Sequence, residues 1–217
     1  MSESKSQPET KQSAENAEIQ PEIEATFINI DKDQLRAKLK ELGAKLLQPE
    51  TLMRRTIFDI DEHSFVRVRD EGNRITMSYK HLDTLSLSGM KEICLDVNNY
   101  NDAINFVKAC GLKPKALQET LREEWELDGV ELDIDTWPWL PSYVEIEGAS
   151  EAAVKSVADK LGFNMTDALY GSVDEVYKIY YDVTRHDINY CPEIKFTDIP
   201  GWLATKRREQ PLRQPRL

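Results

Sequence analysis

Charged and apolar residues alternate along most of the strand-like segments of this chain, and this alternation limits the folds that it can form. Side chains of a β-strand point alternately to the two faces of a sheet, so residues of one parity share a face. In seven segments one parity is mostly charged and the other mostly apolar. A buried ionised side chain is costly unless an opposite charge neutralises it. The charged faces carry Glu22, Glu24, Arg67, Arg69, Lys80, Glu92, Arg122, Asp133, Asp135, Glu145 and Glu147.

Two folds fit this alternation, and the pattern favours neither. An antiparallel sheet can pack helices on its apolar face and expose its charged face to water. Alternatively, the sheet curls into a barrel with the charged face lining the lumen. Arginines cluster on two segments and carboxylates on three others. A lumen of both charges suits a strongly anionic ligand that arrives with Mg²⁺, because arginine forks hold phosphate oxygens and carboxylates hold hard cations. A triphosphate fits that description.

The predicted elements indicate an α+β fold of antiparallel strands with helices outside the sheet. Helices are indicated by apolar residues three or four positions apart, and three of them end at a glycine. We predict helices at 31–43, 99–110, 151–161 and 173–182. We predict strands at 22–28, 52–60, 64–69, 74–81, 90–97, 115–127, 129–136 and 142–148.

Composition limits the class of protein. No run of 18 apolar residues and no signal segment is present, so we expect a cytoplasmic protein without membrane contact. Three scattered cysteines and three scattered histidines argue against a disulfide framework and a zinc site. The net charge is −11, with +4 at residues 204–217 and −2 at residues 1–20, so the body carries −13. An acidic body argues against nucleic-acid binding.

Four regions are predicted along the chain. Residues 1–20 are almost free of apolar residues and indicate a disordered leader. Residues 21–183 hold the main domain, residues 184–203 form a C-terminal extension, and residues 204–217 form a basic flexible tail. Tyrosines at 177, 180 and 181 indicate a packing stripe or, alternatively, a homodimer contact.

Five charged elements, in order and with suitable spacing, resemble the CYTH superfamily of triphosphate tunnel enzymes. They are Glu22-x-Glu24, the Arg-Val-Arg at 67–69, Lys80, the arginine before DGVELDIDTWPWLP, and YVEIEG at 143–148. The resemblance covers about residues 21–182. It implies an eight-stranded antiparallel tunnel with a charged lumen, which binds a small-molecule triphosphate with Mg²⁺ or Mn²⁺, two ions in all.

The resemblance also implies roles for individual residues. Glu22, Glu24, Lys80 and Arg122 would be catalytic. Arg67, Arg69, Lys80 and Arg122 would hold phosphate, with Glu92 supporting the basic cluster. Glu22, Glu24, Asp133 or Asp135, Glu145 and Glu147 would hold metal.

The chain departs from the family pattern at two positions. Thr26 stands where the family's Glu-x-Glu-x-Lys has its lysine, and Thr120 stands where many members have another. Both changes remove positive charge from the lumen. A threonine hydroxyl can orient water but is no base near neutral pH.

Three activities fit the resemblance. Hydrolysis of tripolyphosphate or of a nucleoside or other organic triphosphate is the leading hypothesis. The first alternative is an adenylyl cyclase of class IV, which would need an adenine pocket, with Trp137 and Trp139 as a stacking wall or simply as packing residues. The second is a module that binds triphosphate or polyphosphate without turnover.

Overall fold

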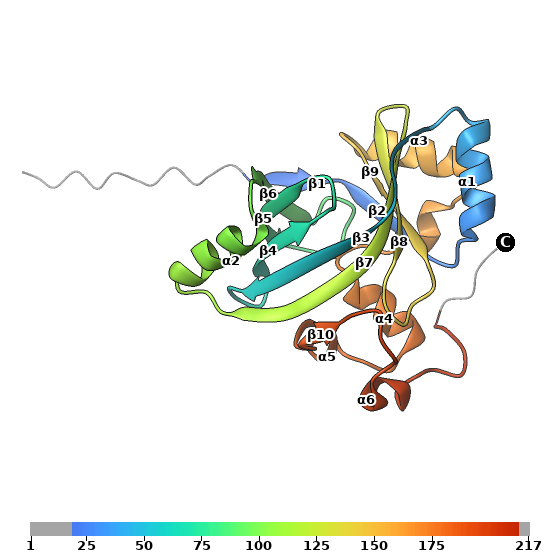
Figure 1. Ribbon diagram of the computed structural model, residues 1–217. Helices are drawn as coiled ribbons and strands as arrows, with labels where there is room; N and C mark the ends of the chain where they lie inside the picture. The colour runs from blue at the N-terminus through green and yellow to red at the C-terminus, as the bar shows by residue number, and fades with distance from the viewer. Residues whose placement is uncertain (1–18, 213–217) are drawn as a thin grey trace, which may run out of the picture.

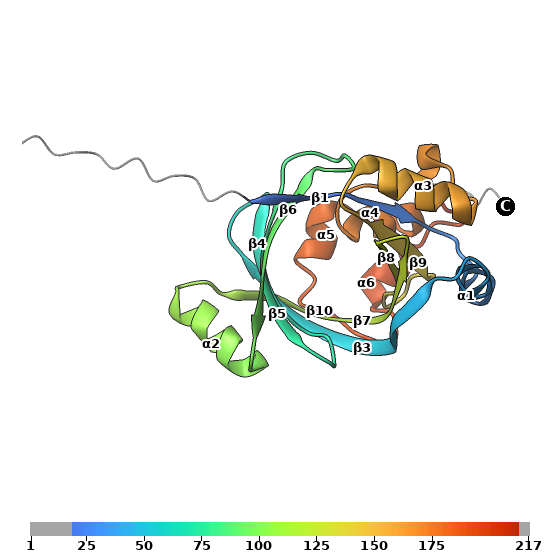
Figure 2. The ribbon, with the colours of Figure 1, turned by 90° about the horizontal axis from the view of Figure 1, so that it is seen from above.

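A single antiparallel sheet curls into a barrel in the computed structural model, which describes residues 19–212. Viewed from above, the strands form a ring (Figure 2). The predicted α+β barrel is therefore correct, and the open sheet is excluded. The strands are β1 (Gln20–Glu22), β2 (Glu24–Phe27), β3 (Lys45–Asp59), β4 (Ser64–Asp70), β5 (Ile75–Leu82), β6 (Met90–Val97), β7 (Pro114–Leu127), β8 (Val130–Thr136), β9 (Tyr143–Glu147) and β10 (Glu193–Ile194).

The first strand segment closes the barrel. Neighbouring strands follow the order β1-β6-β5-β4-β3-β7-β8-β9-β2, with β10 attached to β7. Since only Ile23 separates β1 from β2, one stretch of chain pairs with β6 at one end and with β9 at the other. Counted as one, the two halves give the eight barrel strands that were predicted. Closure is partial, because β1 pairs with β6 only as far as Glu92.

The longest strand begins earlier than predicted. β3 starts at Lys45 instead of residue 52 and pairs with β7 as far as Pro114. The register of this pair shifts on both sides of Gln48. Pro49, which lacks an N–H, lies in this irregular stretch, where a missing ladder hydrogen bond is tolerated.

Helices cover two opposite sides of the barrel (Figure 1). The predicted helices appear as α1 (Lys32–Glu41), α2 (Tyr100–Ala109), α3 (Glu151–Leu161) and α4 (Asp174–Tyr180). α1 and α3 pack Leu39 and Val154 against outward side chains such as Leu132 and Ile146, all of them buried. α2 covers the outer face of β3 and β4 at Phe58. The apolar parity of these strands thus forms the core outside the barrel, which leaves the charged parity for the lumen.

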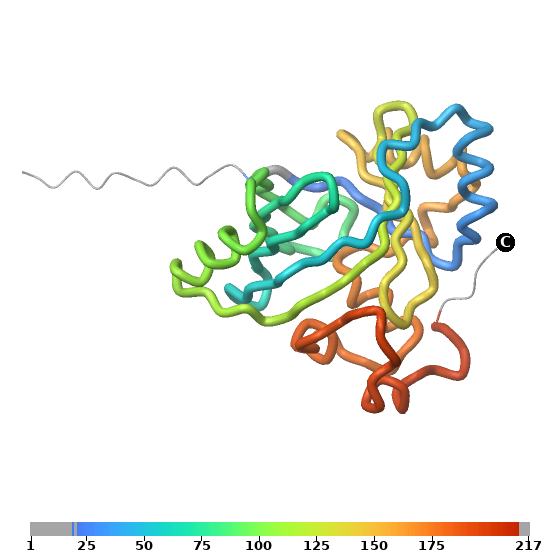
Figure 3. Tube along the Cα trace, in the orientation of Figure 1, coloured from blue at the N-terminus to red at the C-terminus, as the bar shows by residue number. Residues whose placement is uncertain are grey.

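The segment after α4 was not predicted to be structured beyond an extension. It contains α5 (Arg185–Asn189), β10 and α6 (Gly201–Ala204), and it runs beneath the strands (Figure 3). Ile188 is 1% exposed and packs in a cluster with the buried side chains of Tyr177 and Tyr181. β10 pairs in parallel with β7. The extension therefore shares its core with the barrel.

The ends of the chain are described in part. The predicted leader lies outside the described residues as far as position 18. Within the segment predicted as a flexible tail, the Arg208 Nε donates to the Lys178 carbonyl at 3.2 Å and the Leu212 N–H donates to the Ile179 carbonyl at 3.0 Å. Residues 213–217 lie outside the described part. No helix within residues 19–212 has the length and apolarity needed to cross a membrane.

We expect Ile188→Ala to lower the free energy of unfolding by roughly 2–5 kcal/mol, because it leaves a cavity in a buried cluster. Urea unfolding followed by circular dichroism should show one transition at a lower midpoint. Phe196→Ala, at a 42% exposed position of the same extension, is the control. A separate early transition for Ile188→Ala would show instead that the extension unfolds independently of the barrel.

Candidate functional site

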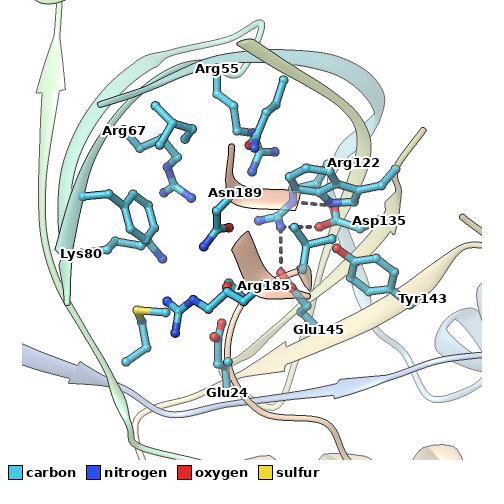
Figure 4. Close-up of a pocket in the computed structure, with 18 of the residues that line it drawn as sticks. Glu24, Arg55, Arg67, Lys80, Arg122, Asp135, Tyr143, Glu145, Arg185 and Asn189 are labelled. Atoms are coloured by element: carbon cyan, nitrogen blue, oxygen red, sulfur yellow. Dashed lines mark hydrogen bonds and ion pairs between the residues drawn. The ribbon is translucent and has the colours of Figure 1, made fainter. Parts of the chain in front are cut away.

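A cavity inside the barrel brings together side chains from strands β2 to β9 and from α5. The space not filled by atoms is about 830 Å³, including its opening to solvent. Arg55, Arg67 and Lys80 lie on one side of this cavity, while Asp135 and Glu145 lie on the other (Figure 4). The two signs of charge therefore face each other across a space that can hold a ligand.

Arg122 is held by three carboxylates. Its Nε and Nη2 donate to both oxygens of Asp135 at 2.7 and 2.6 Å, and Nη2 also donates to Glu145 at 2.8 Å. Nη1 donates to Asp133. Burial opposes the charge of Arg122, but the three carboxylates outweigh it and raise its pKa well above the ordinary value. Since β7 pairs with β8, and β8 with β9, the sheet itself fixes this network.

A second network of ion pairs joins Lys80 to Glu22 and Glu92. The Lys80 Nζ donates to both oxygens of Glu22 at 2.7 and 2.8 Å. Glu92 lies 3.6 Å from the same Nζ and accepts from the Arg67 Nη2 at 3.2 Å. Burial raises the pKa of Glu22 to about 7, although Lys80 opposes the shift. Glu92 thus links Lys80 to Arg67.

Carboxylates on β2, β8 and β9 also lie opposite one another. Glu24 lies opposite Glu147 in the β2–β9 pair, and Asp133 lies opposite Glu145 in the β8–β9 pair. Burial, and after it the charge of Glu145, raises the pKa of Glu24 well above the ordinary value. Burial also raises the pKa of Asp133 well above the ordinary value, although Arg122 opposes the shift. The pKa of Glu145 is raised by burial and by Asp135, and that of Glu147 by burial against the opposing charge of Lys80. Like charges in directly opposed positions are destabilising unless a cation lies between them.

These side chains are chemically suited to bind a divalent cation. Their carboxylate oxygens are the ligands that Mg²⁺ and Mn²⁺ prefer. Across residues 19–212, however, no three or more His, Cys, Asp or Glu side chains are already arranged around a metal position. Arg122 and Lys80 account for this, because they hold Asp133, Asp135, Glu145 and Glu22 as ion pairs.

One predicted phosphate ligand lies away from the cavity. Arg69 points into the barrel, but its Nε and Nη2 contact the fully buried Glu71 at 2.8 and 2.6 Å. Arg74 and Thr76 also donate to Glu71 at 2.6 and 2.7 Å. Burial opposes ionisation, but Arg69 and these donors together lower the pKa of Glu71 to about 2. Parity placed Arg69 on the correct face, but it could not show that Glu71 neutralises it.

Three cavity cations were not predicted as site residues. Arg55 lies on β3 and shares its inward parity with the apolar Met53 and Ile57. Lys115 lies at the start of β7, and Arg185 lies on α5, in a segment without periodicity. Of the three, only Arg55 could have been found by strand parity, since Lys115 has the opposite parity to Arg122 on its strand.

Arg55 contacts Thr120, one of the two positions at which the resemblance implied a lysine. Its Nη2 donates to the Thr120 Oγ1 at 2.6 Å, and its guanidinium lies over the Trp137 ring, 4.7 Å from the centroid. Burial and the charges of Arg69 and Arg67 lower the pKa of Arg55. Its Nε is buried and has no partner among the described residues, and the same holds for the Arg67 Nε. These cations therefore have donors to spare for an anion.

The sequence of residues 20–180 matches the CYTH domain family. The chain belongs to this family. The family segment contains all the residues predicted for the site, from Glu22 to Glu147, whereas α5 lies beyond its end. The family resemblance proposed from the sequence is thus confirmed. No curated protein matches the chain.

Solved structures share the CYTH fold of this chain at low identity. The PH1012 protein from Pyrococcus horikoshii OT3 is 21% identical with a TM-score of 0.60, over 68% of this chain and 93% of that one. A conserved hypothetical protein from Pyrococcus furiosus is 19% identical with a TM-score of 0.59, over 68% and 94%. A protein of Vibrio parahaemolyticus, assigned provisionally as an adenylate cyclase, is 10% identical with a TM-score of 0.63, over 74% and 99%. At these identities the likeness concerns the fold.

The pKa of Glu22 predicts a pH dependence of stability. Because this pKa rises from 4.5 to about 7 on folding, the folded protein keeps a proton that the unfolded chain loses within this window. The free energy of unfolding of the metal-free protein should therefore fall as pH rises from 4.5 to 7. Urea titrations at several pH values should show a flatter dependence for Glu22→Gln. Glu41→Gln, exposed on α1, should keep the wild-type slope, and equal slopes for all three proteins would contradict the prediction.

Proposed function

We propose that this protein hydrolyses a triphosphate inside the barrel with the help of Mg²⁺ or Mn²⁺. The observation that carries the proposal is the cavity itself, in which Arg55, Arg67 and Lys80 face Glu24 and Glu145. A triphosphate is strongly anionic and binds divalent cations, so it needs both kinds of partner at once. Phosphoryl transfer depends mainly on positioning and charge stabilisation, which is what such a cavity supplies.

The phosphate chain would lie along the cationic side. Arg67 and Arg55 present unpaired Nε donors there, and guanidinium groups bind phosphate oxygens in pairs. Lys80 and Arg122 now hold carboxylates and would turn toward phosphate oxygens as the ligand enters. The carboxylates that these two side chains release would then be free to bind the cation. Phosphate binding and metal binding should for this reason depend on each other.

The metal would lie on the carboxylate side. Glu24 and Glu147 are the natural ligands, because they oppose each other and their pKa values are raised. Glu22, Glu145 and either Asp133 or Asp135 would complete the set after Lys80 and Arg122 release them. When bound, the cation would neutralise phosphate charge and lower the pKa of a water molecule. The protein's own contribution is to hold the phosphate chain still, in line with that water.

The two tryptophans favour hydrolysis over cyclisation. Formation of cyclic AMP needs a surface on which adenine can stack. Arg55 already covers a face of Trp137, which is buried. The Trp139 indole donates to the Thr197 carbonyl at 2.9 Å in the C-terminal extension. Both rings therefore serve packing, although the provisional assignment of the Vibrio protein keeps adenylyl cyclase as the alternative to test.

We expect the purified protein to release orthophosphate from tripolyphosphate in Mg²⁺ or Mn²⁺. Cyclic AMP and pyrophosphate from ATP would instead select the cyclase. If calorimetry shows binding but no product forms, the protein is a binding module. Thr26 and Thr120, which stand in place of lysines, are the reason to test this alternative.

Arg67→Ala should lower kcat/KM for the triphosphate by roughly 10- to 100-fold, because it removes charge-assisted hydrogen bonds to phosphate. Glu145→Gln should lower it too and raise the metal concentration required. Steady-state assays of phosphate release measure the effects of both substitutions. Arg54→Ala, at an exposed neighbour of Arg55 on β3, should leave activity unchanged. If Arg67→Ala behaves like Arg54→Ala, the cavity is not the site of reaction.

Glu147→Gln should have opposite effects with and without metal. In EDTA it removes a half-buried carboxylate opposite Glu24, so the free energy of unfolding should rise by roughly 1 kcal/mol. In Mn²⁺ it removes a ligand, so the stabilisation that the ion gives should shrink. Thermal unfolding in both buffers measures the two effects. A variant that is less stable than wild type in EDTA would contradict the repulsion argument.

A further inference from the structure

Helix α5 places two polar side chains in the cavity. Arg185 and Asn189 are four residues apart and so share one face of the helix. Both line the cavity with Lys80 and Glu24, and Arg185 extends between Asn189 and Glu24 (Figure 4). Seen from above, α5 lies across the ring of strands (Figure 2). The CYTH match ends at residue 180, so this wall of the cavity comes from the chain's own extension.

The helix is fixed by packing and at both ends. Thr184 and Asp187 form a reciprocal capping box at its start. Ile188 lies within the buried cluster beneath the barrel. After the helix, the Tyr190 hydroxyl donates to the Asp59 Oδ2 at 2.9 Å, and Lys115 lies 4.8 Å from the centroid of its ring. α5 is therefore a firm wall and holds its two polar side chains in place.

Arg185 keeps a free donor at this wall. Its Nε is buried without a hydrogen-bond partner in the described part of the chain. Asp187, the carboxylate of the same helix, is occupied by Thr184 and by the Lys206 Nζ at 3.1 Å. With Arg55 and Arg67, three guanidinium groups of one cavity hold unused Nε donors. An anion with several oxygens is the ligand that would satisfy them.

We propose that Arg185 and Asn189 form a subsite for the terminal phosphoryl group of the triphosphate, with α5 as the end wall of the pocket. The inference rests on the proposed function. A terminal phosphoryl group has three free oxygens and more charge than an internal one, so it suits a guanidinium beside an amide. Because α5 lies across the ring of strands (Figure 2), in this proposal it closes the pocket beyond Arg185. The substrates are then triphosphates with one free terminal phosphoryl group, inorganic tripolyphosphate and nucleoside triphosphates among them.

The first test measures tripolyphosphate binding by calorimetry in EDTA, where no metal-dependent turnover occurs. Arg185→Ala should raise Kd by roughly 10- to 100-fold, as for the loss of charge-assisted hydrogen bonds. Arg185→Lys, which keeps the charge, should recover part of the affinity. Arg207→Ala, an exposed arginine of the same extension, should bind like wild type, and circular dichroism should show all three variants folded.

The outcomes separate this subsite from the proposed function. Wild-type affinity in a folded Arg185→Ala overturns the subsite and leaves hydrolysis untouched. Binding that depends on Arg185, without phosphate release in Mg²⁺ or Mn²⁺, supports the subsite and overturns the hydrolase. No binding by the wild type in EDTA overturns the subsite, and phosphate release in Mg²⁺ or Mn²⁺ then tests the hydrolase separately.

The second test uses a triphosphate esterified at both ends. Diadenosine triphosphate should bind to the wild type at least about tenfold more weakly than ATP, because neither of its ends presents a free phosphoryl group to Arg185. Equal affinities for diadenosine triphosphate and ATP would contradict the proposal that α5 closes the pocket.

Discussion

Opposite charges must pair inside the barrel, and the rest of the structure depends on that constraint. Taking an ion out of water costs several kcal/mol unless partners replace the water. Arg122 meets three carboxylates, Lys80 meets Glu22, and Arg69 meets Glu71. Each pair joins side chains that the strands bring into register. The barrel can therefore hold many ionised groups without unfolding, provided that the pairs stay formed or that a ligand replaces them.

The pairing is incomplete at the cavity, and this incompleteness points to function. Glu24 lies directly opposite Glu147, while the buried Nε donors of Arg55 and Arg67 have no partner among the described residues. Unmatched carboxylates and unmatched guanidinium groups thus lie in one barrel. A metal–triphosphate complex carries a cation for the carboxylates and an anion for the guanidinium groups, so its binding would neutralise both groups together. The same incompleteness continues onto α5, where Arg185 meets the cavity from outside the family segment.

The alternation of residues along the strands predicted much of this site. Parity placed Arg67, Lys80, Arg122 and the carboxylates in the lumen, because the period of a strand is fixed by its backbone. It could not show that Glu71 neutralises Arg69, since that contact depends on side chains beyond the strand end. It did not single out Arg55, whose inward neighbours on β3, Met53 and Ile57, are apolar.

The sequence by itself determined the strand faces, the helices on the apolar side and the family to which the chain belongs. These features depend on residue spacing, which is local. The tertiary structure decided between open sheet and barrel, chose which charges pair, and brought α5 to the cavity. Those outcomes depend on contacts between residues far apart in the chain, such as Tyr190 with Asp59. No local pattern encodes such contacts, because their energy appears only when the strands have closed.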